Sequence, residues 1–168
     1  MILKIVAYGN PVLRKKCEDI TPDYPELAKL ILDMRETMTY ANGIGLAAPQ
    51  INKAIRLFIV GIDDMVFINA KITATEGQCS FVEGCLSIPG VGEAVNRPEK
   101  ITINYFGENF VEHTKTFEGL EARVIQHEYD HIEGKLFTDH LSALSKKLIK
   151  GKLRDITDGK IKTKSPAN

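Results

Sequence analysis

The stretch QHEYDHIEG, residues 126–134, places two histidines four positions apart, with a glutamate directly after the first. An α-helix turns once in about 3.6 residues, so His127 and His131 project from one side of a helix and can share one metal ion. Glu128 lies about 100° further round, where it can reach a water on that ion without being a ligand. Two core histidines bonded to backbone carbonyls would show the same spacing, so the motif by itself is a hypothesis.

The motif lies within a predicted helix that runs from about Leu120 to Glu133 and stops at Gly134. Leu120 and Val124 precede His127 at the same helical steps. We therefore expect these apolar side chains and the two imidazoles to face the core together.

Two further helices are predicted, one on each side of this motif in the chain. The first opens at Thr21-Pro22-Asp23 and ends at a left-handed cap, Asn42-Gly43, and the last covers roughly residues 142–156. The predicted inner faces are Leu27, Leu30, Ile31, Met34 and Met38 in the first helix and Leu144, Leu148, Ile149 and Leu153 in the last.

Four runs rich in β-branched and aromatic residues predict antiparallel strands at residues 54–60, 65–72, 101–106 and 110–117. Strands bracketed by separate helices indicate an α+β single domain, with antiparallel strands packed around the central metal-binding helix and with an N-terminal and a C-terminal helix. We expect a catalytic domain at residues 1–156 and a flexible C-terminal tail at residues 157–168.

The composition agrees with one domain and with a protein of the cytoplasm. The chain has 168 residues, 43% of them hydrophobic, which is enough for one core. It shows no secretory or transit pattern and no stretch of membrane-spanning length, so we expect it to be cytoplasmic. The odd number of cysteines, Cys17, Cys79 and Cys85, favours reduced thiols over a disulfide framework.

A catalytic metal needs a third protein ligand, and the downstream sequence offers no good candidate. In the pattern H-E-x-x-H-x-x-G-x-x-H the last place is occupied by Phe137, which cannot coordinate. No glutamate follows Glu133, and His140 lies beyond the expected helix turn. The third ligand is therefore expected upstream.

The best upstream candidate is Cys85, in EGCLSIPG at residues 83–90, where glycine and proline turn signals let the backbone approach a site closely. A thiolate, two imidazoles and a water suit zinc or ferrous iron. Taken alone, however, a cysteine is more often an inert core residue.

A third motif, GIGLAAPQ at residues 43–50, follows the first predicted helix. With EGCLS and QHEYDH, in this order, it makes the chain resemble the peptide deformylase family in its bacterial form. The likeness extends through NPVLR, FINA and LSALSKKLIKGKLRD, almost to Asp155. The chain departs from the family at Ala70 and at Phe81-Val82, which flank the site and bear on the shape of its pocket.

This resemblance implies roles for several residues of the three motifs. Cys85, His127 and His131 would be the metal ligands, and Glu128 the catalytic acid and base. The remaining candidates are the Gln50 amide and the Leu86 backbone N–H as donors to the formyl oxygen, Ile44, Gly45 and Gly84 as substrate-binding residues, and Arg97 and Asp130 as supports of the ligands. For Arg97 and Asp130, an exposed place on the surface is the alternative.

The implied activity is removal of the N-formyl group from the N-terminal formyl-methionine of nascent polypeptides, with release of formate. The resemblance implies Fe2+ as the physiological metal, with Zn2+, Ni2+ or Co2+ as replacements in preparations. We also expect a monomer with no membrane partner.

The C-terminal helix adds a candidate partner. Residues 142–168 contain eight Lys or Arg and two Asp, a net charge of +6. Because family members act on nascent chains, this basic helix could contact the ribosome through RNA phosphates. A solvated helix face is the alternative.

Three other functions stay open at this point. A zinc endopeptidase of the H-E-x-x-H type would cleave internal bonds of unformylated peptides. A thiol hydrolase that uses Cys85 and a histidine would need no ion. A structural metal site in a ribosome-binding module would tolerate Glu128→Ala, whereas a deformylase would keep its metal and lose turnover.

Overall fold

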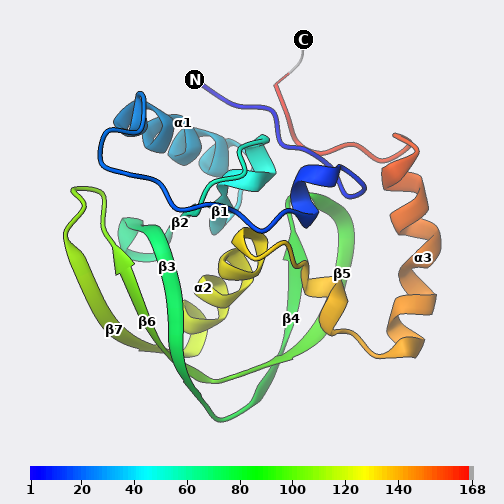
Figure 1. Ribbon diagram of the computed structural model, residues 1–168. Coiled ribbons are helices and arrows are strands. Elements are labelled where there is room, and N and C mark those ends of the chain that lie inside the picture. The colour runs from blue at the N-terminus through cyan, green and yellow to red at the C-terminus, as the bar shows by residue number, and fades with distance from the viewer. Residues whose placement is uncertain (167–168) are drawn as a thin grey trace.

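In the computed structural model, which describes residues 1–166, seven strands form two separate antiparallel sheets (Figure 1). The larger sheet has the order β1-β2-β3-β6-β7, and the smaller sheet pairs β4 with β5. The strands are β1 (Gly45–Ala47), β2 (Leu57–Val60), β3 (Met65–Glu76), β4 (Cys79–Cys85), β5 (Ile88–Arg97), β6 (Lys100–Phe106) and β7 (Glu112–Glu118). The antiparallel pairing confirms the predicted α+β class.

Three α-helices and four short 3-10 helices complete the described part of the chain. They are α1 (Leu27–Tyr40), α2 (Gly119–Ile132) and α3 (Ala143–Thr157), with η1 (Pro11–Arg14), η2 (Ala48–Ile51), η3 (Ile62–Asp64) and η4 (Phe137–His140). Helix α2 lies between the two sheets, and α3 stands beside β5 at the far side of the molecule (Figure 1). The helix that carries the histidines is therefore central, as predicted.

Strand β2 is buried on both of its faces. Phe58 and Val60 belong to the apolar cluster that includes α2, and Leu57 and Ile59 belong to the cluster that includes α1. Successive side chains of a strand point to opposite faces, so α1 and α2 cover opposite sides of the larger sheet. Each such side chain contributes about 1.5–3 kcal/mol through burial. Phe58 also stacks on Phe67, with ring centroids 4.8 Å apart.

Helix α1 begins later than predicted, at Leu27 rather than at Thr21. One feature of the sequence and one of the backbone explain the error. Pro25 disfavours a helical backbone at the preceding residue, Tyr24. Glu26 then adopts a left-handed conformation, with φ 53°, which a right-handed helix cannot contain. The predicted end is correct, because Asn42 takes the left-handed conformation with φ 58°.

The predicted inner face of the last helix is wrong for Leu144 and Leu148, which are 68% and 72% exposed. The prediction is correct for Ile149, which is buried, and for Leu153, which packs against the same cluster, and Ile156 is buried as well. The helix carries two apolar stripes, and only its docking on β5 decides which of them is covered.

Leu120 was also expected in the core, and that prediction is wrong, because the side chain is 51% exposed. It lies in the first turn of α2 and lines a cleft beside the helix. Val124, one turn further on, is buried as expected.

The four predicted strands correspond to β2, β3, β6 and β7, but β1, β4 and β5 were missed. Strand β5 contains proline and two glycines, and β4 exposes most of its side chains. Neither strand shows the alternation of apolar and polar residues that marks a half-buried strand. EGCLSIPG, interpreted as a turn-rich stretch, is in fact the end of β4, a tight turn and the start of β5.

The chain after α3 returns to the N-terminal segment (Figure 1). Thr163 Oγ1 donates to the carbonyl of Ile5 at 2.8 Å, and the Ile5 N–H donates to Ser165 Oγ at 3.1 Å. Residues 167–168, the end of the predicted flexible tail, lie outside the described residues. Among residues 1–166, no helix has the length and apolar character needed to cross a membrane.

Candidate metal centre

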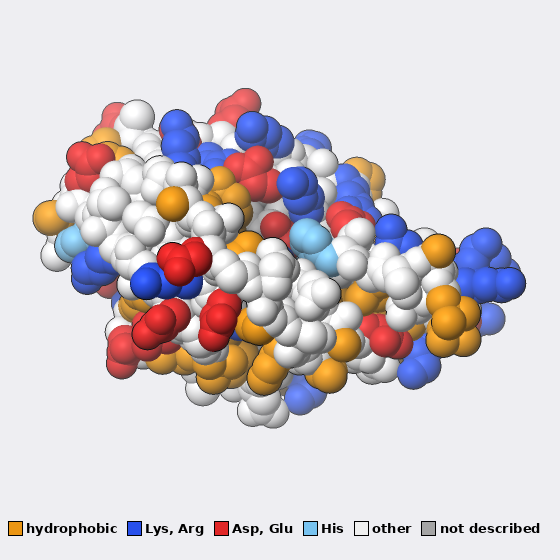
Figure 2. Space-filling model, turned by 90° about the horizontal axis from the view of Figure 1, so that it is seen from below, with side chains coloured by type: hydrophobic (Ala, Val, Ile, Leu, Met, Phe, Trp, Pro, Cys, Tyr) orange, Lys and Arg blue, Asp and Glu red, His pale blue; other side chains and the backbone are white. Residues whose placement is uncertain are grey.

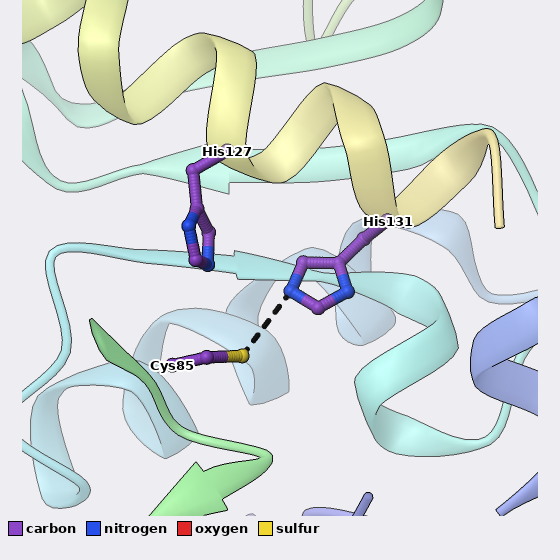
Figure 3. A group of neighbouring side chains, drawn as sticks. All are labelled: Cys85, His127 and His131. Atoms are coloured by element: carbon purple, nitrogen blue, oxygen red, sulfur yellow. Dashed lines mark hydrogen bonds between the residues drawn. The ribbon is translucent and has the colours of Figure 1, made fainter. Parts of the chain in front are cut away.

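Cys85, His127 and His131 meet between the two sheets (Figure 3). Each offers one ligand atom, and these atoms all lie within 4.8 Å of one another. The Cys85 sulfur is 3.4 Å from His131 Nε2. The histidines come from successive turns of α2 and the cysteine from the last residue of β4. The structure thus brings together the three residues that the sequence pointed to.

The donor set fits a divalent metal ion. One sulfur and two imidazole nitrogens are the ligands of a catalytic zinc or ferrous site that keeps a position for water. Burial, reinforced by the nearby His127, lowers the pKa of His131 to about 3. His131 therefore stays neutral at pH 7, and the neutral ring is the form that coordinates metals.

His127 is oriented by a carboxylate. Its Nδ1 lies 2.8 Å from Glu83 Oε1, which leaves Nε2 for the cluster. Burial opposes a charge on His127, but Cys85 and Glu83 outweigh it and hold its pKa well above the usual value. Burial likewise opposes a charge on Glu83, yet His127 and Arg97 hold its pKa far below the usual value. Such a partner fixes the ring and raises its basicity as a ligand.

Glu83 is also the centre of a buried charge network. Its Oε2 accepts hydrogen bonds from Arg97 Nε at 2.6 Å and from Arg123 Nη1 at 2.7 Å. Arg97 Nη1 reaches Asp130 Oδ2 at 2.8 Å, and His140 Nε2 lies 2.7 Å from the same oxygen. The network links β4 and β5 to α2 directly behind the three candidate ligands.

Sequence reasoning proposed Arg97 and Asp130 as supports, and the structure places both in this network. It did not identify Glu83 or Arg123. A general rule could have pointed to Glu83. A histidine that binds a metal usually donates its other ring N–H to a partner such as a carboxylate, so an acidic residue near His127 was to be expected. His140, set aside as a ligand, bonds Asp130 and lies outside the ligand cluster.

Glu128 is 4% exposed and lines the cleft beside the ligands. Burial raises the pKa of its carboxyl to about 7. Within residues 1–166, its Oε2 has no hydrogen-bond partner. Gly45 allows this packing, since a Cβ there would lie 2.5 Å from Glu128 Oε1.

Gln50 and Leu86 supply hydrogen-bond donors at the same place. Gln50 Oε1 accepts from the Ala47 N–H at 2.9 Å, so its Nε2 faces the site, 3.5 Å from the Cys85 sulfur and 3.3 Å from Ser87 Oγ. Leu86 follows Cys85 directly, and its backbone N–H has no acceptor among the described residues. Both N–H groups are therefore available to donate a hydrogen bond to an anionic oxygen.

The cluster opens into a cleft of about 690 Å³. Its lining includes Cys85, His127, Glu128, Gln50, Leu86, Ile44, Gly45 and Gly84. Ile44 is 57% exposed. His131, 1% exposed, lies behind this lining. Among the described strands, β1 is an edge strand and β4 pairs only with β5, so each has a free edge at the cleft.

Comparisons with known proteins agree with this geometry. The family model "Polypeptide deformylase" matches residues 2–147. Peptide deformylase from Flavobacterium johnsoniae is 53% identical, covering 95% of this chain and 92% of that protein, and the one from Christiangramia forsetii is 52% identical, covering 96% and 92%.

Solved structures are similar over the same range. The crystal structure of a peptide deformylase from Legionella pneumophila has a TM-score of 0.88 and 38% identity, covering 95% of this chain and 98% of that one. The structure from Thermus thermophilus has a TM-score of 0.89 and 37% identity, covering 95% and 99%. The residues matched by the family model, 2–147, include all three motifs of the site.

Proposed function

Because the chain belongs to the peptide deformylase family, we propose that Cys85, His127 and His131 hold its metal ion and that Glu128 transfers the proton in its reaction. The protein is a metallohydrolase that removes the N-formyl group from the formyl-methionine of nascent polypeptides. One observation carries the assignment of roles: the three ligand atoms converge within 4.8 Å, with the Glu128 carboxyl at the same cleft.

A divalent ion, when bound, supplies Lewis acidity that polarises a carbonyl oxygen and brings the pKa of a water to about 7. Glu128 accepts the proton of the attacking water as the oxygen forms a bond to the formyl carbon. The C–N bond then breaks, and Glu128 returns the proton to the departing nitrogen. The products are formate and a free amino group.

Charge that develops on the formyl oxygen is stabilised by Gln50 Nε2 and the Leu86 N–H. Gln50 is held in place by its bond to Ala47 and exchanges its contact with Ser87 for one with substrate. A donor of this kind is typically worth about 3 kcal/mol in the transition state.

The substrate lies extended between the free edges of β1 and β4. Gly45 and Gly84 let its backbone approach both strands, and main-chain hydrogen bonds can form as in strand addition. The exposed side chain of Ile44 lines the pocket for the methionine side chain. An apolar wall gives little discrimination between side chains of similar size.

The site is tested by Glu128→Ala, which should retain the metal and lose about a hundred- to ten-thousandfold in formate release from a formyl-Met peptide. Cys85→Ala is the matched variant that should lose the metal itself. Metal analysis of both proteins separates the two effects. Undiminished turnover by Glu128→Ala would contradict its role, and cleavage of an unformylated peptide would favour an endopeptidase.

For the metal, we propose Fe2+, with Zn2+, Ni2+ or Co2+ as replacements. A ferrous ion beside a thiolate is open to oxidation, so activity should decline in air and persist without oxygen. Metal analysis of protein purified without oxygen, paired with the formate assay, identifies the ion. Full activity of the native zinc form in air would exclude iron as a requirement.

We further propose that residues 1–156 form the catalytic domain of a cytoplasmic monomer that contacts the ribosome through α3. The Lys and Arg side chains of α3 are exposed, and Figure 2 shows basic side chains gathered at that end of the molecule. The residues are Lys146, Lys147, Lys150, Lys152 and Arg154. Their change to Glu should weaken ribosome binding and its salt dependence. Unchanged binding in a sedimentation assay would remove the proposal.

A further inference from the structure

The segment that follows α3 forms part of the wall of the metal cleft. Lys164 is one of the residues that line the cleft, together with ligands such as Cys85 and His127. The segment is held in place on both sides of this lysine, because Thr163 and Ser165 each bond the backbone of Ile5.

Lys164 is held at the cleft by this anchoring. Thr163 and Ser165 both bond Ile5 through their side-chain hydroxyls, and Lys164, which stands between them, lines the cleft. Ile161, earlier in the segment, packs against the apolar cluster of η1, β5 and α3. The tail is thus attached at several points while Lys164 faces the cleft.

Lys164 differs from the other charged residues of the lining. Glu83 and Arg123 are buried and paired with each other, and Glu128 is buried. Lys164 is exposed, and no carboxylate of residues 1–166 forms an ion pair with it. A second ammonium lies near the rim, since Lys152 Nζ is 3.4 Å from the carbonyl of Gly90, another lining residue.

We propose that Lys164 is a specificity-determining residue that binds a carboxylate of the polypeptide downstream of the formyl-methionine. This rests on the proposed function, because the cleft must hold the chain that follows the formyl group. An exposed ion pair changes an equilibrium by up to about fivefold. Lys164 therefore adjusts substrate preference and takes no part in the chemical step.

The test compares formyl-Met peptides that carry Glu, Gln or Lys at the second, third or fourth position. Each peptide is made as a C-terminal amide and as a free acid, so that a side-chain carboxylate is distinguished from a terminal one. The native enzyme should favour Glu over Gln about two- to fivefold in kcat/KM, through a lower KM, at one or more positions. Salt at about 0.5 M should reduce this preference, because exposed charges are screened.

Lys164→Ala should bring the ratio of Glu to Gln peptides to about one, and Lys164→Glu should favour the Lys peptides. Lys162→Ala is the matched control, because Lys162 is exposed on the same segment but does not line the cleft. It should keep the native ratio.

The proposal is overturned if the native enzyme shows no preference for Glu at any position, or if Lys164→Ala keeps the native ratio. Equal loss of preference in Lys162→Ala would also overturn it, by pointing to the general charge of the tail. Turnover of the Gln peptides by the native enzyme separates a failure of this proposal from a failure of the proposed function. If the native enzyme does not deformylate the Gln peptides, the deformylase function is contradicted. If it does, the experiment tests only the role of Lys164.

Discussion

Helix α2 meets the larger sheet through an apolar face and the β4–β5 sheet through a charged one. On the first side, Val124 and Ile125 pack in one cluster with Phe67. On the second side, Arg123 and His127 bond Glu83. Apolar burial has no preferred direction and follows the area removed from water, whereas hydrogen bonds between charged groups are directional. The first contact holds the helix in the fold, and the second sets the orientation of His127, a proposed metal ligand.

The energetic difference between the two faces is equally instructive. Removing charges such as Glu83 and Arg97 from water costs several kcal/mol, which their attraction offsets only when every partner is in place. A buried ion pair is therefore weak evidence for stability. Its presence directly behind His127 is better explained by the ligand geometry that it imposes.

The largest combined effect on stability and metal affinity is expected from removal of Glu83, the central residue of the charged face. Glu83→Ala leaves Arg123 buried without a carboxylate and Arg97 with Asp130 as its one remaining carboxylate partner, so the metal-free protein should lose about 3–5 kcal/mol in unfolding free energy. Loss of the acceptor for His127 should also weaken metal binding about 10- to 100-fold. Denaturant titration and a competition assay with a chelator measure the two effects. Unchanged metal affinity in the folded variant would contradict the positioning role of Glu83.

The apolar face should respond in stability alone. Ile125→Ala removes buried methyl groups and leaves a cavity, at a cost of about 2–5 kcal/mol. Metal affinity and turnover per folded molecule should remain close to native, because no ligand is bonded to this face. The same denaturant and chelator titrations check the result. A tenfold loss of metal affinity in Ile125→Ala would contradict the claim that only the charged face affects metal binding.

A smaller effect is expected at the outer part of the charged network. Asp130→Asn weakens the bonds to Arg97 and His140 but keeps the pair of Glu83 with His127. Because a hydrogen bond to a charged group is worth about 1.5–3 kcal/mol, the stability loss should be within that range. Metal affinity should change less than in Glu83→Ala. An equal or larger loss of affinity would place the orienting contact at Asp130.

The smallest effect is expected on the exposed stripe of α3. Leu148→Ala should change the unfolding free energy by no more than about 0.5 kcal/mol, because the side chain is exposed. Ile149→Ala, its buried neighbour, should cost about 2–5 kcal/mol. Thermal or denaturant unfolding of the pair tests which apolar residues belong to the core. Similar losses for both variants would show that Leu148 is covered in solution.

Much of the candidate site was predictable because its parts are local in sequence. The spacing of His127 and His131 needs only a helix, and the lack of a suitable downstream ligand directed the search upstream, where Cys85 was the best candidate. The late start of α1 had a local signal in Pro25, but the other errors concern features without one. Leu144, Leu148 and Leu120 are apolar but exposed, and β4 and β5 lack the usual strand pattern.

The sequence by itself determined the period of α2, and with it the common direction of two imidazoles and the neighbouring place of Glu128. It also determined the family to which the chain belongs. Tertiary structure alone decided that Glu83 orients His127 and that Cys85 approaches His131. The physical reason is range: helical geometry is set by bonds between residues four apart, whereas contacts across more than forty residues depend on how α2 packs between two sheets.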